Sequence, residues 1–199
     1  MKSLVLGLSL ATLALCALPD PPKSKIAGLT TAPIRLELYE DFSCPHCRVV
    51  HEQMLPQLIR DFVAPGKAYI VFRDYVLNGP GHQYSRMAAT YAAAAARIGK
   101  YQAACDAIFQ SQNSWAFSGQ IWPNISASFN AEEQKKILAL AQEPSLQTEV
   151  QNDVDAGNAL PITQTPTMIV VFRGRRQPWT VFTSYDLLKS YLDQLLKGR

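Results

Sequence analysis

Hydrophobic and polar residues alternate over residues 34–39, and this pattern predicts the first β-strand of the chain. Residues 45–62 have helical spacing instead, with an expected inward stripe of Val49, Val50, Met54, Leu58 and Phe62. Pro56 lies inside this helix and is expected to kink it. Residues 68–73 are rich in β-branched and aromatic side chains and predict a second strand, which the turn residues 78–81 follow.

The pattern changes after residue 81 and becomes helical. Helices are predicted over residues 84–98, 101–109, 131–142 and 144–157, with an irregular aromatic stretch over residues 115–129. Residues 167–172 then predict a buried strand, and residues 179–182 a strand that pairs with it across a turn at Gly174. Ser184 is expected to cap a final amphipathic helix over residues 185–197. The order predicts an α/β domain in two parts, residues 33–79 and 161–199, with an all-helical insertion over residues 80–160.

The first seventeen residues have the pattern of a signal peptide. Lys2 precedes a mainly apolar run over residues 4–15, and small residues follow it. The run is too short to span a bilayer, which favours a signal peptide over a transmembrane helix. A buried N-terminal strand or helix is the alternative interpretation. Lipid anchoring at Cys16 is the less favoured interpretation, because Leu15 stands where such a site usually has a small residue. Residues 18–32 contain prolines and lysines and are interpreted as an exposed lead-in.

Composition narrows the function further. The chain has 199 residues, and its net charge of +3 is too weak and too dispersed to indicate binding of nucleic acid. Removal of the predicted signal peptide leaves Cys44, Cys47 and Cys105. A single close pair does not make a disulfide-stapled scaffold, so this pair is interpreted as a working dithiol. Cys105 is interpreted as a small core residue.

The close pair is Cys44-Pro45-His46-Cys47, placed where a predicted strand meets a helix N-terminus. The two sulfurs are one helical turn apart, and the helix dipole favours the thiolate form of Cys44. Pro45 suits the first helical turn because its missing N–H is not needed there. His46, if protonated, stabilises the thiolate further and makes the disulfide easier to reduce.

A metal site is the alternative for these cysteines. Cys44, Cys47 and His51 could in principle bind zinc, but zinc takes four ligands and no second pair is evident. We therefore expect no metal and interpret His51 as a helix-surface residue. His82 follows a Gly-Pro-Gly turn, and a structural role is favoured over contact with the active-site surface.

Thr165-Pro166 precedes the strand predicted over residues 167–172, and an X–Pro bond at such a place can be cis. Together these features resemble the DsbA-like thiol:disulfide oxidoreductases of the thioredoxin superfamily. The resemblance covers about residues 26–197 and depends on residues 41–47, 81–82, 99–101, 115 and 165–167.

The resemblance implies a thioredoxin fold with an inserted all-helical domain, and it assigns roles to the motif residues. Cys44 is the exposed nucleophile, Cys47 the buried resolving sulfur, His46 and Pro45 tune the pair, and Thr165 and Pro166 form the cis-proline loop, whose backbone can pair with substrate. One departure is that Leu38 stands where relatives often carry a buried acid. Glu37 is expected to point to the opposite face, whereas Glu40 shares the face of Leu38 nearer the strand end.

The resemblance also implies the function. We expect an exported enzyme in the periplasm or another extracytoplasmic space, without a cofactor, that introduces disulfides into cysteine-containing proteins. Its expected redox partner is a membrane quinone-linked protein, and the lack of a dimerisation domain indicates a monomer. A reductase or isomerase on the same scaffold, or a non-catalytic peptide-binding or holdase module, are the alternatives. The redox potential of the cysteine pair distinguishes a reductase or isomerase from an oxidase. Replacement of Cys44 by serine would abolish enzymatic activity but leave a peptide-binding or holdase activity intact.

Overall fold

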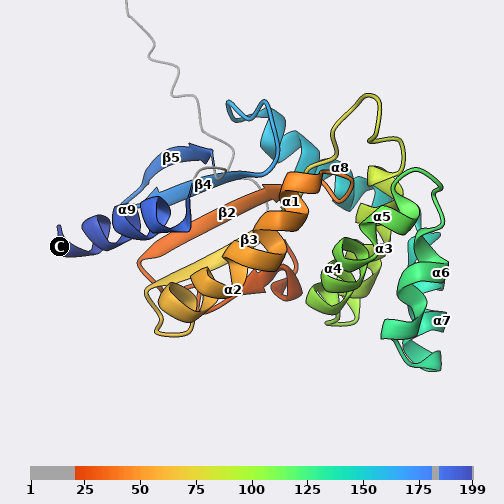
Figure 1. The fold of residues 1–199 in the computed structure, drawn as a ribbon. Helices are drawn as coiled ribbons and strands as arrows, with labels where there is room; N and C mark the ends of the chain where they lie inside the picture. The colour runs from red at the N-terminus through yellow and green to blue at the C-terminus, as the bar shows by residue number, and fades with distance from the viewer. Residues whose placement is uncertain (1–20, 181–183, 199) are drawn as a thin grey trace, which may run out of the picture.

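The computed structural model describes residues 21–180 and 184–198. The predicted signal peptide and residues 181 and 182 of the predicted last strand lie outside this range. Figure 1 shows a sheet with helices α1 and α2 across one face and a block of helices beyond its edge. No helix in the described part of the chain combines the length and apolar character needed to cross a membrane.

The sheet has five strands in the order β1-β3-β2-β4-β5. They are β1 (Ile26–Ala27), β2 (Ile34–Glu40), β3 (Ala68–Asp74), β4 (Thr167–Phe172) and β5 (Arg175–Thr180). β2 and β3 are parallel, and the other neighbours are antiparallel. The strands predicted over residues 34–39, 68–73 and 167–172 are confirmed.

The last strand begins earlier than predicted. Arg175 already pairs with Phe172, four residues before the predicted start at Trp179. Arg173 and Gly174 both have positive φ, at 49° and 75°, which gives a tight two-residue turn that lets pairing resume at once. The two-residue strand β1 was not predicted, because so short a segment has no readable alternation.

The helix predicted from Pro45 is present but is not a uniform α-helix. It consists of α1 (Pro45–Val49), the π-helical turn η2 (Val50–Met54), α2 (Leu55–Leu58) and the π-helical turn η3 (Ile59–Val63). Pro56 lies in the first turn of α2, directly after a π-helical turn, where its missing N–H can be accommodated. The inward stripe is wrong at Val49, which is 46% exposed because it lies beside the stripe at the rim of a surface pocket.

The insertion is helical, as predicted. It consists of α3 (Ser85–Arg97), α4 (Tyr101–Gln110), α5 (Gln112–Trp115), α6 (Ile121–Ile125), the 3-10 turn η4 (Ser126–Ser128), α7 (Ala131–Ala141) and α8 (Pro144–Asn158). The aromatic stretch that was expected to be irregular contains the short elements from α5 to η4. Asn130 begins α7 with a capping box that includes Glu133. The final helix, α9 (Tyr185–Lys197), begins as predicted with the Ser184 hydroxyl accepting from the Asp186 amide.

Successive residues of β2 face two different cores. Leu36 and Leu38 belong to the large core that includes Cys47 and the alanine-rich helix α3, whereas Tyr39 packs in a smaller core that includes Val154 of α8. Both faces of the strand are therefore covered, although its sequence alternates like that of a half-exposed strand. The two faces give the polar residues of β2 different surroundings.

Residues 18–32 were interpreted as an exposed lead-in, but the described part of this segment is not fully exposed. Residues Lys23–Lys25 form a 3-10 turn, η1, and the Lys25 side chain is completely buried. Its ammonium group lies 2.6 Å from the Asp74 carboxylate and 2.9 Å from that of Asp153. The Tyr101 hydroxyl also donates to Asp74, at 2.6 Å. A buried ammonium group requires charged partners, and the two carboxylates supply them. The bonds connect the lead-in to β3, α4 and α8.

Candidate active site

The paired cysteines lie at the junction of β2 and α1. Cys44 is the residue before the first turn of α1, and Pro45 occupies that turn. Cys47 is fully buried, and Cys44 is 6% exposed, so the predicted order of exposure holds although Cys44 is less exposed than expected. Both are free thiols in this structure, which therefore represents the reduced state. Pro45 and His46 are exposed beside them.

The surroundings of the two sulfurs give them opposite acidity. A hydrogen bond from the Cys47 thiol is the largest factor that lowers the pKa of Cys44, to about 5, followed by Thr165 and the backbone N–H groups of Cys47 and His46. Partial burial of Cys44 opposes this shift. Burial raises the pKa of Cys47 well above its usual value, and the hydrogen bond to Cys44 and the charge of Glu40 raise it further. The reduced site therefore holds one thiolate and one thiol at neutral pH.

The predicted second element lies against the first. The Thr165–Pro166 peptide bond is cis, and the Cys44 sulfur is 3.5 Å from the carbonyl oxygen of Thr165. Thr165 is buried, and Pro166 directly precedes β4. The fold thus brings together two segments that are 121 residues apart in the chain.

A buried carboxylate holds the loop that carries Cys44. Asp41 Oδ1 accepts from the Ser43 amide and from the Ser85 hydroxyl, each at 2.7 Å, and lies 3.1 Å from His82 Nδ1. Asp41 Oδ2 accepts from the Leu77 amide at 2.8 Å. His82 therefore contacts the active-site loop through Asp41. The sequence favoured a purely structural role for His82 over such a contact.

The helical insertion also supports this loop. The Gln112 amide donates to the carbonyl oxygens of Phe42, at 2.7 Å, and Cys44, at 3.1 Å. Gln112 is buried at the start of α5. Sequence reasoning missed Gln112 and Ser85, because nothing in the local pattern shows that either side chain reaches a loop about 40 to 70 residues away.

The acidic residues of β2 lie as their parity predicts. The Glu37 carboxylate contacts Arg35 at 2.8 Å, Arg176 at 3.4 Å and the Tyr39 hydroxyl at 3.2 Å, so it belongs to the face opposite Cys47. Glu40 is buried on the face of Cys47. Burial raises the pKa of Glu40 to about 8, with contributions from the charges of neighbouring groups.

His51 is not the helix-surface residue that the sequence suggested. Its side chain is buried, and its Nε2 atom lies 2.7 Å from Asp106 Oδ1 of α4. The insertion covers this side of the helix, which the helical spacing alone could not reveal. No cluster of three or more potential ligands suited to a metal ion occurs within residues 21–180 and 184–198.

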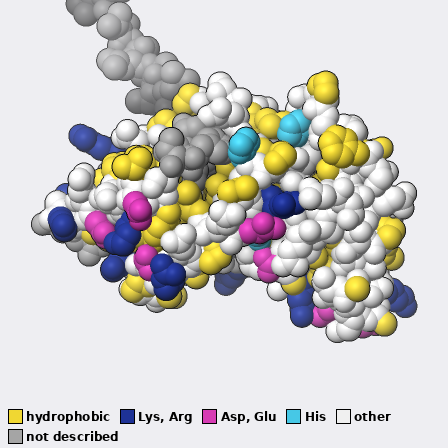
Figure 2. Space-filling model, in the orientation of Figure 1, with side chains coloured by type: hydrophobic (Ala, Val, Ile, Leu, Met, Phe, Trp, Pro, Cys, Tyr) yellow, Lys and Arg dark blue, Asp and Glu magenta, His cyan; other side chains and the backbone are white. Residues whose placement is uncertain are grey.

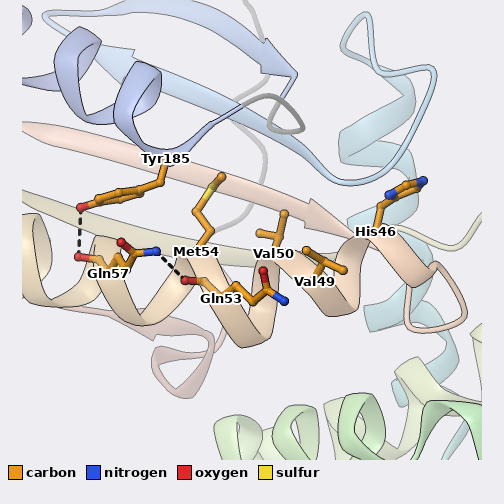
Figure 3. Close-up of a pocket in the computed structure, with 7 residues that line it drawn as sticks. All are labelled: His46, Val49, Val50, Gln53, Met54, Gln57 and Tyr185. Atoms are coloured by element: carbon orange, nitrogen blue, oxygen red, sulfur yellow. Dashed lines mark hydrogen bonds between the residues drawn. The ribbon is translucent and has the colours of Figure 1, made fainter.

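A surface pocket of about 230 Å³ lies beside the cysteines. Its lining comes from one face of the helix that begins at Pro45 and from the start of α9: His46, Val49, Val50, Gln53, Met54, Gln57 and Tyr185. Figure 3 shows Met54 and Tyr185 over the helix and His46 at its N-terminal end, pointing away from them. The Tyr185 hydroxyl donates to the carbonyl oxygen of Gln57 at 3.1 Å. In Figure 2, histidine side chains lie among hydrophobic ones on this face.

Comparisons with known proteins agree with this arrangement. A family model described as thioredoxin matches residues 21–183. Disulfide bond formation protein D of Bacillus subtilis is 22% identical over 190 residues, which cover 91% of this chain and 81% of that protein.

Solved structures show the same fold. Alpha-DsbA1 of Wolbachia pipientis superposes with a TM-score of 0.72 at 20% identity, over 87% of this chain and 91% of that one. BdbD of Bacillus subtilis, in its oxidised form, superposes with a TM-score of 0.68 at 22% identity, over 90% and 97% of the two chains. The chain therefore belongs to the thioredoxin family, and its fold, with a helical insertion and the paired cysteines of a thiol:disulfide oxidoreductase, is similar to that of the DsbA proteins.

Proposed function

We propose that this chain is an exported dithiol oxidase that exchanges its Cys44–Cys47 disulfide with cysteines of other proteins. The observation that carries the proposal is the opposite acidity of the two sulfurs, with the pKa of Cys44 lowered to about 5 and that of Cys47 raised. A sulfur that is stable as a thiolate is a good leaving group, and the substrate meets it first because it is the outer one. The name of the Bacillus subtilis relative, a disulfide bond formation protein, points in the same direction.

The reaction takes two exchange steps. A substrate thiolate attacks the Cys44 sulfur of the disulfide, which forms a mixed disulfide and releases Cys47 as a thiolate that then takes up a proton. A second substrate thiolate attacks the substrate sulfur of the mixed disulfide and expels Cys44 as a thiolate. Two electrons pass from the substrate to the enzyme, so the substrate is oxidised and Cys44 and Cys47 are left reduced.

The stability of the Cys44 thiolate favours oxidation of substrates over their reduction. Hydrogen bonds to Cys44 stabilise the reduced enzyme but not the disulfide, so they make the enzyme more oxidising. The reduced enzyme must then be reoxidised, and we assign that step to a membrane quinone-linked partner. An extracytoplasmic site of action fits this chemistry because disulfides persist there. We further propose that the protein acts as a monomer.

The surface around Cys44 suits an extended peptide. The cis-proline loop presents backbone next to the sulfur, and backbone of this kind can pair with a substrate strand. The pocket between His46 and Tyr185 offers apolar contacts from Val49 and Met54. We assign the substrate's residues flanking its cysteine to these two features.

The test uses a reduced, unfolded protein with two cysteines and the oxidised enzyme in single turnover. The wild-type enzyme is expected to oxidise the substrate, and both Cys44→Ser and Cys47→Ser to be inactive, because neither variant can form the disulfide that accepts the substrate's electrons. Cys105→Ala is the matched control, because this buried thiol is outside the site and its loss should leave turnover unchanged. Full substrate oxidation by Cys44→Ser would contradict the proposal. Suppression of substrate aggregation by Cys44→Ser, without oxidation by the wild type, would favour the holdase alternative.

A further inference from the structure

A single side chain of the helical insertion holds the turn that ends in Cys44. Gln112 is buried, and its amide nitrogen lies 2.7 Å from the carbonyl oxygen of Phe42 and 3.1 Å from that of Cys44. An amide nitrogen carries two N–H groups, so it can donate to both carbonyls at once. The two carbonyls flank Ser43, and one buried amide therefore fixes two points of the loop between β2 and α1.

The segment that carries Gln112 is itself held in place. Trp115 is completely buried, and its indole N–H donates to the carbonyl oxygen of Ile108 at 2.8 Å. This bond closes the chain across the junction of α4 and α5, with Gln112 between its two ends. The ring of Phe109, at the same junction, lies 5.1 Å from the ring of Phe42, centroid to centroid. One short segment thus contacts both the side chain and the carbonyl of Phe42.

The carbonyl of Cys44 also belongs to the start of α1. It accepts from the Arg48 amide at 3.3 Å, which is long for the first bond of a helix. Cys44 has an extended backbone, with φ of −75° and ψ of 119°, and its side chain makes no capping bond. Rotation about ψ moves the carbonyl and the attached helix relative to the Cys44 side chain. A second donor on this carbonyl therefore restrains the orientation of Cys44 against α1.

That orientation decides how well the Cys44 thiolate is stabilised. Its donors include the thiol of Cys47 and the backbone N–H groups of Cys47 and His46, and all of these belong to α1. Hydrogen bonds weaken steeply when their distance or angle departs from the favoured range. Partial burial of Cys44 acts in the opposite direction and favours the thiol. A rotation of Cys44 away from these donors would therefore make it less acidic.

The other side-chain support from the insertion acts one residue further from the sulfur. The Ser85 hydroxyl of α3 lies 2.7 Å from Asp41 Oδ1 and 2.9 Å from Ser43 Oγ. These contacts hold residues 41 and 43, whereas the bond from Gln112 reaches the backbone of Cys44 itself. Gln112 is thus the contact through which a change in the insertion would alter Cys44 most directly.

We propose that Gln112 is a positioning residue for thiol–disulfide exchange, and that through it the helical insertion orients Cys44 against the start of α1. Gln112 acts through the backbone of the loop and not through the sulfur. This inference depends on the proposed function, since the orientation of Cys44 matters to catalysis only if this sulfur exchanges disulfides. The insertion then contributes to the chemistry of the site as well as to the core.

The experiment compares glutamine-to-methionine substitutions at two positions of the full chain. Gln112→Met keeps the length of the side chain but removes both N–H donors. Gln134→Met is the matched control, because the Gln134 amide also donates to two carbonyls of the insertion, those of Ser126 at 3.0 Å and Phe129 at 2.9 Å. The pKa of Cys44 is measured from the pH dependence of alkylation of the reduced enzyme. The reduction potential against glutathione buffers and unfolding by urea are measured on the same proteins.

We expect Gln112→Met to raise the pKa of Cys44 by about 0.5–1 unit, because the bonds to the thiolate are weakened without being lost. Its reduction potential should fall by about 15–30 mV, since one pKa unit corresponds to about 30 mV for a two-electron couple. Gln134→Met should match the wild type in both quantities, although each variant should unfold at a lower urea concentration. A purely structural role for Gln112 would change the unfolding and leave the pKa and the potential at their wild-type values.

Two outcomes would overturn the inference and leave the proposed function intact. One is a wild-type pKa and potential in Gln112→Met, and the other is an equal shift in Gln134→Met. Where Gln112→Met does not unfold cooperatively, the comparison uses Gln112→Asn, which keeps the amide on a shorter side chain, and a wild-type pKa there overturns the inference as well. A wild-type enzyme that leaves the reduced substrate unoxidised would instead contradict the proposed function, and with it the role of Gln112 in exchange.

Discussion

Replacement of Cys47 by alanine should make Cys44 markedly less acidic. The Cys47 thiol is the largest single factor that lowers the pKa of Cys44 to about 5. Alanine removes this donor, while the backbone N–H groups of residues 46 and 47 remain. Serine at the same position keeps a donor of similar size, so Cys47→Ser is the matched control.

The expected size of the change follows from the type of bond. A hydrogen bond to a charged acceptor contributes about 1.5–3 kcal/mol. One pKa unit corresponds to about 1.36 kcal/mol, so the pKa of Cys44 should rise by about 1–2 units, to about 6–7, in Cys47→Ala. In Cys47→Ser it should stay near the value of about 5 given by the structure.

Ultraviolet absorbance of the thiolate, recorded as a function of pH, measures this pKa directly, and the pH dependence of alkylation provides a second readout. Cys44→Ser gives the baseline, because burial raises the pKa values of Cys47 and Cys105 well above the range scanned. The reasoning would be refuted if Cys47→Ala and Cys47→Ser titrated with the same midpoint. A wild-type midpoint near the ordinary thiol value of about 8.5 would refute the assigned surroundings of Cys44 altogether.

Three further predictions concern stability, each measured by urea unfolding. Because folding lowers the pKa of Cys44, its thiolate should raise the free energy of unfolding of the reduced enzyme relative to that of Cys44→Ser. This stabilisation should be complete above about pH 8.5, decrease as the pH falls, and disappear below about pH 5. A stability difference that grows toward acid pH would contradict this. Lys25→Met should cost about 3–5 kcal/mol because it leaves buried carboxylates unpaired, whereas Lys136→Ala, at an exposed pair, should cost less than about 1 kcal/mol. Gly157→Ala should destabilise the protein by about 1–3 kcal/mol despite better helix propensity, since the new Cβ would lie 2.5 Å from the ring of Tyr75; unchanged or increased stability would show that the ring can move.

The sequence was sufficient for most of the fold because local chemistry marked its boundaries. The buried strand at residues 167–172 was predicted from its run of strand-forming residues, and the final helix from the capping residue Ser184 and helical spacing; both are confirmed. The lead-in was wrong at Lys25 because a lysine in a proline-rich segment gives no sign of two buried carboxylates that lie far away in the chain.

The site shows the same division. The cysteine pair could be predicted because its spacing and its place at a helix N-terminus are local features. His51 could not, because its burial depends on α4, and its partner Asp106 is 55 residues away. Gln112 was missed for the same reason, since its bonds to the active-site loop exist only after the insertion has packed against the sheet. Tertiary contacts decided each case in which the local pattern was insufficient.

The reduction potential of the Cys44–Cys47 pair, equilibrated against glutathione buffers, tests the central claim most directly. With a pKa of about 5, the Cys44 thiolate stabilises the reduced enzyme by about 2.7 kcal/mol at pH 7, because each pH unit above the pKa contributes about 1.36 kcal/mol. This corresponds to a rise of about 60 mV relative to a pair without the shift. The account predicts a potential near or above about −150 mV, as expected for a dithiol oxidase. A potential near about −270 mV would contradict it and assign the protein to the reductases.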